Sequence, residues 1–349
     1  MRSSYKEDDV TMLLKDITGL VEPQPTEERE RLIQSGKHYS EMLPIEYVPT
    51  QKYMEVYEEA LERFAEPTAH AVGRLSDKII QAKGKDVVLV SLARAGIPIG
   101  ILVKHYIRQK YNIDVPHYSI SIIKGRGIDD NAMKYLLEHY KPQQLLFVDG
   151  WIGKGAILNE LKQDIEAYEG VSADIAVVAD PANVTELCGT HDDILIPSSC
   201  LNSTVSGLVS RTFLRDDIIG PDDFHGAVYY GELADSDLSY AFLDAIERRF
   251  CMDTPPEDRQ IEGYGADEVA ALASVFGVDD INLIKPGIGE TTRVLLRRVP
   301  WKVLIDRRYQ DSQELRHIVR LAEEKNVPIE FYPLEHYKCC GIIKKLAEA

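Results

Sequence analysis

The sequence predicts a doubly wound α/β domain, because short apolar runs alternate with amphipathic stretches through most of its first 250 residues. Three of the runs read VVLVSL at 87–92, LLFV at 145–148 and DIAVVA at 174–179. Continuous apolar and β-branched runs are typical of parallel strands that are buried on both faces. Helical spacing after the first two runs predicts helices that end near Tyr111 and Tyr168. We therefore expect a parallel sheet covered by helices.

The other segments of this domain are assigned by the same periodicity. One or two amphipathic helices are expected over 53–81, after a polar and irregular N-terminal arm. The segment 188–215 interrupts the rhythm, and we expect a strand end, a polar turn and a helix capped near Asn202 or Ser203. The remaining expected elements are a strand near 118–123, a loop over 124–131, a helix over 132–140 and a helix over 238–250.

A second, smaller domain is predicted after the run DTPPEDRQ at 253–260, which combines two prolines with four charges. The expected division is a first domain over 1–252, a linker over 253–263 and a compact α/β/α module over 264–349. Within this module the pattern predicts helices and strands in alternation, with a final helix over the segment CCGIIKKLA.

The two parts of the chain differ in net charge. The whole chain carries a formal net charge of −17, but residues 281–349 contain 13 Lys and Arg and only 9 Asp and Glu. The acidic first part is a poor candidate for nonspecific nucleic-acid binding, whereas the basic tail is not excluded. Five cysteines without a CxxC pair fit reduced thiols. With no signal peptide and no run of 18 apolar residues, we expect a soluble cytoplasmic protein without a membrane partner.

The stretch LLFVDGWIGKGAIL at 145–158 is the strongest candidate for a binding site. A buried strand here opens into a glycine-rich turn that leads into a helix, and such a turn directs backbone N–H groups at one point, as a phosphate requires. Asp149 at the strand end is placed to accept hydrogen bonds from sugar hydroxyls. The spacing is not that of a nucleotide-triphosphate P-loop. An ordinary strand-to-helix turn is the alternative.

A second glycine-containing turn, ARAGIPIG, follows the strand at 87–92. Small residues let a backbone approach an anion, and Arg94 can supply a bidentate contact. Between the two turns, Lys124 and Arg126 form a basic loop, for which a solvated hairpin is the alternative.

Together these motifs resemble the type I phosphoribosyltransferases, whose pattern is a hydrophobic strand, two acids, a short loop and a glycine. Asp149 matches the first acid and Gly155 the closing glycine, while Gly150 replaces the second acid. The phrases HYSEML, VSLARAGIPIG, VDGWIGKGAI and IPSSCLNSTVSGLVSRT, from about 36 to 250, are similar to the phosphoribosyltransferase-like domain of tellurium-resistance and stress operons. That family also carries the label StiP, a cysteine protease.

The resemblance implies a type I phosphoribosyltransferase-like fold and a transferase that acts on a phosphoribosyl or nucleotide substrate, presented free or on RNA. Asp149, Lys154 and Arg94 would be catalytic, and Mg²⁺ would be held through the pyrophosphate rather than by protein ligands. The residues expected to bind the phosphoribosyl group and its phosphates are Gly150, Trp151, Ile152, Gly153, Gly155, Ala156, Ala93, Ala95, Gly96, Lys124 and Arg126. Those expected to form a polar wall over the substrate are Ser199, Asn202, Ser203, Thr204 and Arg211.

Two alternatives come from other classes of function. A cysteine peptidase would use Cys200, which lies in a turn of small residues, with His225, His191 or His38 as the base. A noncatalytic nucleotide or RNA sensor would keep the fold without turnover.

The tail segments PGIGETTRVLLRRVPWKVLID, ELRHIVRLAEEKNVPIEFYPL and CCGIIKKLA, from about 281 to 349, resemble the Pelota and kink-turn-binding superfamily. This resemblance implies an RNA partner, although Gly289 replaces the family's Asn. Arg298 extends the basic face, and a solvated helix with scattered arginines is the alternative. The residues implied in RNA contacts are Gly287, Gly289, Glu290, Thr291, Thr292, Arg293 and Arg297.

Overall fold

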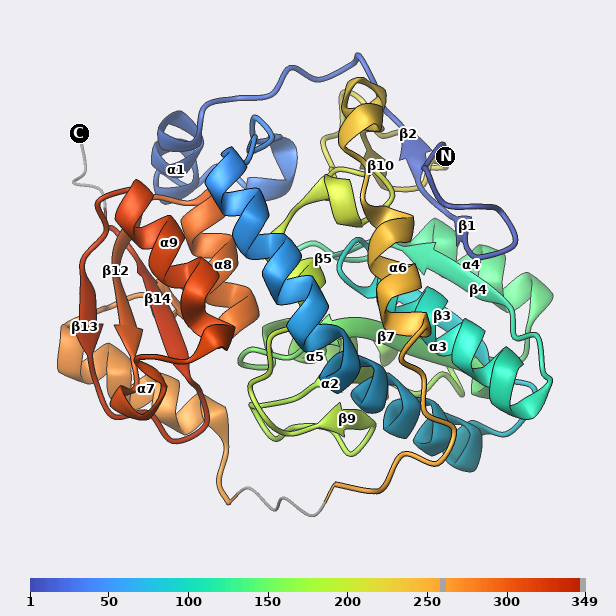
Figure 1. Ribbon diagram of the computed structural model, residues 1–349. Coiled ribbons are helices and arrows are strands. Elements are labelled where there is room, and N and C mark those ends of the chain that lie inside the picture. Colours follow the sequence, from blue (N-terminus) through green and yellow to red (C-terminus); the bar gives the residue numbers. More distant parts are fainter. Residues whose placement is uncertain (258–261, 346–349) are drawn as a thin grey trace.

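A parallel sheet of six strands forms the centre of the larger unit in a computed structural model of the chain, which describes residues 1–257 and 262–345 (Figure 1). The strand order is β1-β4-β3-β7-β8-β9, and every neighbouring pair is parallel. The expected parallel α/β fold is therefore confirmed. The strands are β1 (Thr11–Met12), β3 (Val88–Leu92), β4 (His117–Ile120), β7 (Leu145–Trp151), β8 (Ile175–Ala179) and β9 (Cys188–Thr190).

Helices cover both faces of this sheet because successive strand side chains point to opposite faces. Leu89, Leu146 and Val178 pack in one core with the helices α2 (Gln51–Lys83), α3 (Gly96–Tyr111) and α6 (Ser239–Glu247). Val90, Phe147 and Val177 pack in a second core with α4 (Asp130–His139) and α5 (Ala156–Ile165).

The segment after β9 differs from the expectation, because it holds no α-helix. Two 3₁₀ turns, Pro197–Cys200 and Ser203–Val205, take its place. Small polar side chains here bond to nearby backbone and side-chain groups instead of supporting a helix: Ser206 Oγ donates to Asn202 O, and Ser203 Oγ donates to Glu46. Of the helix predicted to begin near Asn202 or Ser203, only the 3₁₀ turn Ser203–Val205, with Asn202 at its N-cap position, is present.

The smaller unit contains a four-stranded sheet of order β11-β14-β12-β13, in which β14 is antiparallel to both neighbours. The predicted final helix over CCGIIKKLA is wrong, because its first part is the central strand β14 and all five residues of that strand are buried. The elements of this unit are α7 (Gly265–Phe276), β11 (Ile284–Pro286), α8 (Ile288–Arg297), β12 (Pro300–Ile305), α9 (Arg316–Glu324), β13 (Ile329–Phe331) and β14 (Cys339–Ile343).

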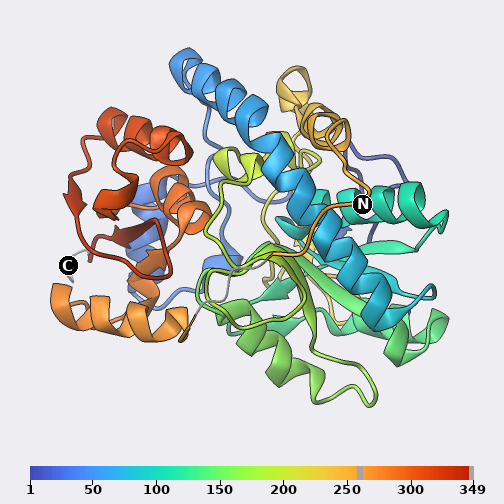
Figure 2. The same cartoon turned by 60° about the horizontal axis from the view of Figure 1, so that its bottom comes forward.

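Helix α2 packs against both units (Figures 1 and 2). Its first turns bury Tyr53 and Tyr57 in a core with Leu295 of α8 and Leu321 of α9. Its later turns bury residues such as Val72 against the large sheet. The sequence predicts one or two helices over this segment. The structure has a single helix, and this helix joins the two cores.

Short elements and boundary segments complete the description. Of the predicted linker 253–263, residues 258–261 lie outside the described residues, as do 346–349 of the predicted second domain. No helix in the described part of the chain is long and apolar enough to cross a membrane. The remaining elements are β2 (Lys15–Asp16), α1 (Thr26–Gln34), β5 (Ile122–Ile123), β6 (Gly127–Ile128) and β10 (Gly226–Ala227), with 3₁₀ turns at Tyr39–Glu41, Pro142–Gln144, Gly231–Ser236, Ile281–Leu283, Arg307–Tyr309 and Gln313–Leu315.

Candidate functional site

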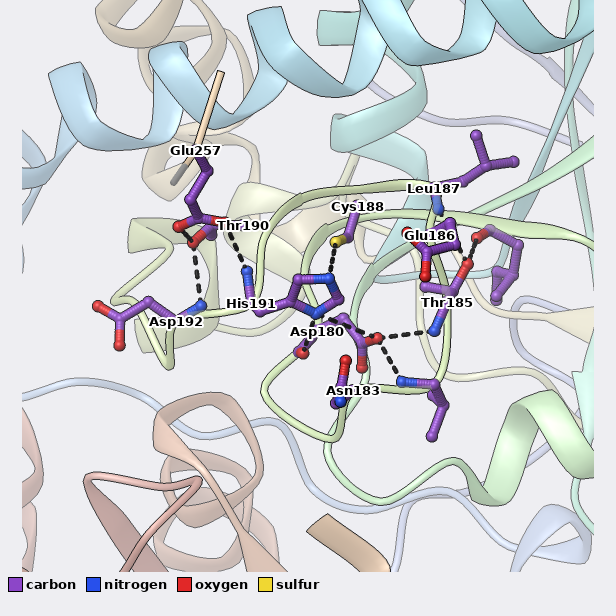
Figure 3. A network of polar contacts seen from close by, with 12 residues as sticks. Asp180, Asn183, Thr185, Glu186, Leu187, Cys188, Thr190, His191, Asp192 and Glu257 are labelled. Carbon is purple, nitrogen blue, oxygen red and sulfur yellow. Dashed lines mark hydrogen bonds and ion pairs between the residues drawn. The ribbon is translucent and has the colours of Figure 1, made fainter. Parts of the chain in front are cut away.

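A thiol and an imidazole meet at the edge of the large sheet (Figure 3). Cys188 begins the edge strand β9, and its Sγ lies 3.3 Å from Nε2 of His191. The other ring nitrogen, Nδ1, lies 3.1 Å from the backbone oxygen of Asp180 and 3.7 Å from its Oδ2. The thiol, the imidazole and Asp180 are therefore connected by hydrogen bonds in the order that a nucleophile, its base and a group that orients the base require.

Asp180 is fixed by the turn that follows β8. Its Oδ2 accepts hydrogen bonds from Val184 N at 2.6 Å and Thr185 N at 2.8 Å, while its own N–H donates to Thr190 O (Figure 3). Burial raises the pKa of this carboxyl, and the backbone donors oppose that rise. The turn and the end of β9 are thus held together around one buried side chain.

The strand that carries the thiol is pressed against α2. A Cβ on Gly189 would lie 2.2 Å from Ala71 O of that helix, so the backbone contact requires glycine. Cys188, one residue earlier, points to the opposite face and packs in the core on the α5 side. Glu257 holds the far end of the strand, because its carboxylate accepts hydrogen bonds from Thr190 Oγ1 and from His191 N.

The thiol is in its neutral form at neutral pH. Burial raises the pKa of Cys188 to about 12, and nearby carboxylates including Asp180 add to the rise. His191 is the only imidazole bonded to it among the described residues, and 16% of the histidine side chain is exposed. A proton that leaves the sulfur therefore has an acceptor that reaches solvent.

No other cysteine has this arrangement; all five lie in the described residues. Cys200, the predicted alternative nucleophile, is buried in the core between the two units, and burial raises its pKa to about 12, as it does for Cys188, so only the histidine contact distinguishes the two thiols. The three histidines proposed as its base bond elsewhere: His38 to Ser40 and Lys124, His191 to Cys188 and Asp180, and His225 to Ser121. The structure thus gives Cys200 no histidine partner.

The glycine-rich loop after β7 is covered by the smaller unit. Lys154 Nζ donates to Ile281 O at 2.5 Å and to Ile284 O at 2.9 Å, and Tyr337 donates to Gly153 O at 2.7 Å. Asp149 accepts from the next backbone N–H, that of Gly150, at 2.7 Å, and desolvation raises the pKa of Asp149 to about 6. The expected sugar-phosphate crevice is therefore filled by protein groups.

The segment predicted to bind RNA provides part of this cover. The guanidinium of Arg293 lies 4.4 Å from the ring centroid of Trp151, and a Cβ on Gly289 would lie 2.2 Å from that ring. The cavity between the loop and α8 measures about 10 Å³, roughly the space of one water. Thr291 and Thr292 are buried within the smaller unit, and Thr292 bonds to His317.

Other predicted site residues also contact protein groups, some within the larger unit and some across the boundary between the units. Arg94 donates to Val209 O, Arg297 donates to Asn202 at 2.5 Å, and Arg211 lies over the ring of Tyr39. Six further predicted site residues make supporting contacts: Ser203 donates to Glu46, Gly287 borders the Asp193 carboxylate, Lys124 donates to Asn282, Arg126 donates to Glu41, Arg293 pairs with Glu290, and Gly96 lies against Val148 O.

These features define an α/β protein with a cysteine–histidine pair at its sheet edge and a docked second module. The family comparison agrees: residues 3–247 match the family described as "Tellurite-like stress resistance cysteine protease StiP", and the chain belongs to this family. Residues 264–345 match the Pelota RNA-binding domain. Both resemblances expected from the sequence are confirmed.

A curated relative supports the same assignment. The "Cysteine protease StiP" of Acinetobacter baylyi (strain ATCC 33305 / BD413 / ADP1) is 34% identical over 367 residues, which span 99% of this chain and 94% of the relative. Among solved structures, a hypoxanthine-guanine phosphoribosyltransferase from Bacillus anthracis str. 'Ames Ancestor' is 15% identical and covers 37% of this chain and 77% of its own, with a TM-score of 0.26. A likeness that weak carries no functional argument.

The expected phosphoribosyltransferase activity is therefore wrong. The family and the relative are named as cysteine proteases, and the Asp149 loop lies under the smaller unit instead of in an open crevice. Among residues 1–257 and 262–345, no group of three or more His, Cys, Asp or Glu side chains could hold a metal ion. The Mg²⁺ that we expected to arrive with a pyrophosphate stays a prediction.

Cys188 is not among the site residues that the sequence predicted, and His191 was considered only as one possible base for Cys200. The available signal was a cysteine and a histidine three residues apart, one at the start and the other directly after the end of the short strand β9.

Proposed function

We propose that the chain is a cysteine peptidase in which Cys188 is the nucleophile and His191 the general base. The observation that carries the proposal is the 3.3 Å contact between Cys188 Sγ and His191 Nε2. The membership of the StiP family and the name of the Acinetobacter relative support the same reaction class.

The contacts of His191 support a defined order of proton transfer. With Nδ1–H donating to Asp180 O at 3.1 Å, Nε2 carries the lone pair that faces the thiol. Nε2 takes the proton from Sγ, and the sulfur attacks the peptide carbonyl carbon to form a tetrahedral intermediate. The imidazolium then gives that proton to the departing amine, which leaves an acyl thioester. Water, deprotonated by the same nitrogen, hydrolyses the thioester and restores the thiol.

Burial of the nucleophile supports a gated form of this activity. Cys188 is 0% exposed, so a peptide carbonyl reaches Sγ only after the surrounding chain moves. The adjoining segment without regular secondary structure is the turn at 181–187. Two of its backbone N–H groups donate hydrogen bonds to the Asp180 carboxylate. We therefore expect low basal activity in the resting protein.

The smaller unit is proposed to bind RNA, as the name of its matching family model indicates. We further propose that the linker couples this unit to the cysteine–histidine pair, because Glu257 in the predicted linker accepts hydrogen bonds from Thr190 Oγ1 and His191 N.

The test compares Cys188→Ala with Cys200→Ala in the full chain. Hydrolysis of a fluorogenic casein and labelling by a peptidyl chloromethyl ketone are measured, and the labelled cysteine is identified by mass spectrometry. Cys188→Ala should abolish both signals, while Cys200→Ala, a matched loss of a buried thiol, should keep them in the folded fraction. Hydrolysis that survives in Cys188→Ala and disappears in Cys200→Ala would overturn the assignment.

A further inference from the structure

Six arginines converge where the two units meet, and the proposed peptidase reaction uses none of them. Three come from the larger unit and three from α8 and its end in the smaller unit. We refer to this set as the arginine cluster: Arg29, Arg94, Arg211, Arg293, Arg297 and Arg298.

Carboxylates neutralise only part of the cluster. Glu30 pairs with Arg298 at 2.5 Å, and Glu290 pairs with Arg293 at 2.8 Å. Glu46 lies 3.8 Å from Arg94. Within the described part of the chain, the structure records no ion pair for the other three members, which are Arg29, Arg211 and Arg297.

The positive charges of the cluster lower the pKa values of neighbouring arginines in the cluster. Burial and, after it, the like charge of Arg29 lower the pKa of Arg211 to about 9. Burial and Arg298 lower the pKa of Arg29 to about 10, and burial with Arg94 lowers the pKa of Arg297. A guanidinium keeps its proton in proteins, so these directions mean that uncompensated positive charge is held out of water.

Two buried polar atoms in the same region lack acceptors. Nε of Arg29, in a residue only 1% exposed, has no hydrogen-bond partner among the described residues. The hydroxyl of Tyr230, in a residue 4% exposed, has none there either. Tyr230 interacts electrostatically with Arg29, Arg94 and Arg297, which places it within the cluster. Buried donors without acceptors are rare in native proteins and indicate an absent partner.

We propose that the arginine cluster is a composite binding site for a phosphate group, completed only when the two units are docked. A phosphate offers several oxygens and up to two negative charges, which matches forked guanidinium donors and the surplus positive charge. Of the three members without an ion pair, Arg29 and Arg211 come from the larger unit and Arg297 comes from the smaller unit, so the site belongs to neither alone. The phosphate is supplied by a free nucleotide or by the phosphorylated end of an RNA chain.

The test uses the full chain with inorganic pyrophosphate as the probe, in isothermal titration and thermal unfolding at constant ionic strength. Wild type should bind saturably and unfold at a higher temperature with the probe. Arg211→Gln and Arg297→Gln should each weaken binding at least about tenfold. Arg307→Gln, an exposed change in the smaller unit, is the matched control and should bind as wild type does.

The variants also make a prediction without ligand. Because Arg211→Gln removes unpaired positive charge, it should unfold at a temperature equal to or above that of wild type in the absence of pyrophosphate. No saturable binding by wild type, or equal binding by Arg211→Gln and Arg307→Gln, would overturn the proposal. So would destabilisation of ligand-free Arg211→Gln, since a purely structural arginine would behave in that way.

A short RNA, with and without a terminal phosphate, distinguishes the two sources. Tighter binding of the phosphorylated form, displaced by pyrophosphate, assigns the site to an RNA end. Equal binding of both forms, undisturbed by pyrophosphate, assigns it to a free phosphate ligand.

Discussion

The ends of β7 and of β8–β9 lie on the same edge of one parallel sheet but have different surroundings. At the end of β7, Lys154 and Gly153 bond to the smaller unit, so that the glycine-rich loop is closed. At the ends of β8 and β9, Asp180 and His191 bond within the larger unit and bring an imidazole to a thiol. The carboxyl edge of a parallel sheet is where active sites form in such folds, but the neighbours of each strand end decide which end is reactive.

The largest expected effect concerns the end that carries the cysteine–histidine pair. His191→Gln removes the base and should lower casein hydrolysis at least about 100-fold. The melting temperature should change by only a few degrees, because the ring is partly exposed. His139→Gln, on the exposed end of α4, is the control and should keep full activity. Full activity of His191→Gln would contradict the proposal that the chemistry takes place at the ends of β8 and β9.

The next effect concerns the closed end. Gly289→Ala should lower the free energy of unfolding by about 2 kcal/mol, because the new Cβ meets the ring of Trp151. Urea titration measures this change. Trp151→Leu should recover part of the loss in the double variant, since it removes the ring. If Gly289→Ala left the chain as stable as wild type, the two units would not be docked this tightly in solution.

The smallest expected effect is the pH dependence of stability that Asp149 causes at the end of β7. The folded chain holds the Asp149 proton more tightly than the unfolded chain does, since burial raises the pKa from 3.8 to about 6. Stability therefore falls as pH rises from about 4 to 6. Asp149→Asn should remove that dependence, raise the free energy of unfolding at pH 8 and leave casein hydrolysis unchanged. Loss of hydrolysis would mean that the closed end takes part in the chemistry.

Most of the larger unit was predictable, because its strands are short apolar runs between helical patterns. The strands at β3, β7 and β8 follow directly from that contrast. The final strand was mistaken for a helix, because a five-residue apolar run has no periodicity that separates the two. Only neighbours in space distinguish them, and β14 lies between β11 and β12.

The site was less predictable, because it depends on contacts between segments that are distant in sequence. The Cys188–His191 spacing is visible in the sequence, but Asp180 joins the pair only through the adjacency of β8 and β9. The closure of the Asp149 loop requires knowledge of how two domains dock. Nothing local in either domain specifies that Lys154 will bond to Ile281 and Ile284.

Helix α2 limits how this protein can be divided for study. Tyr53 and Tyr57 lie at the N-terminal end of the helix, yet they belong to a hydrophobic core whose other members include residues of α8 and α9, far later in the chain. A fragment truncated at residue 252 would expose these two aromatic rings and their neighbours to water. We therefore expect the fragment of the first 252 residues to aggregate, and assays should use the full chain.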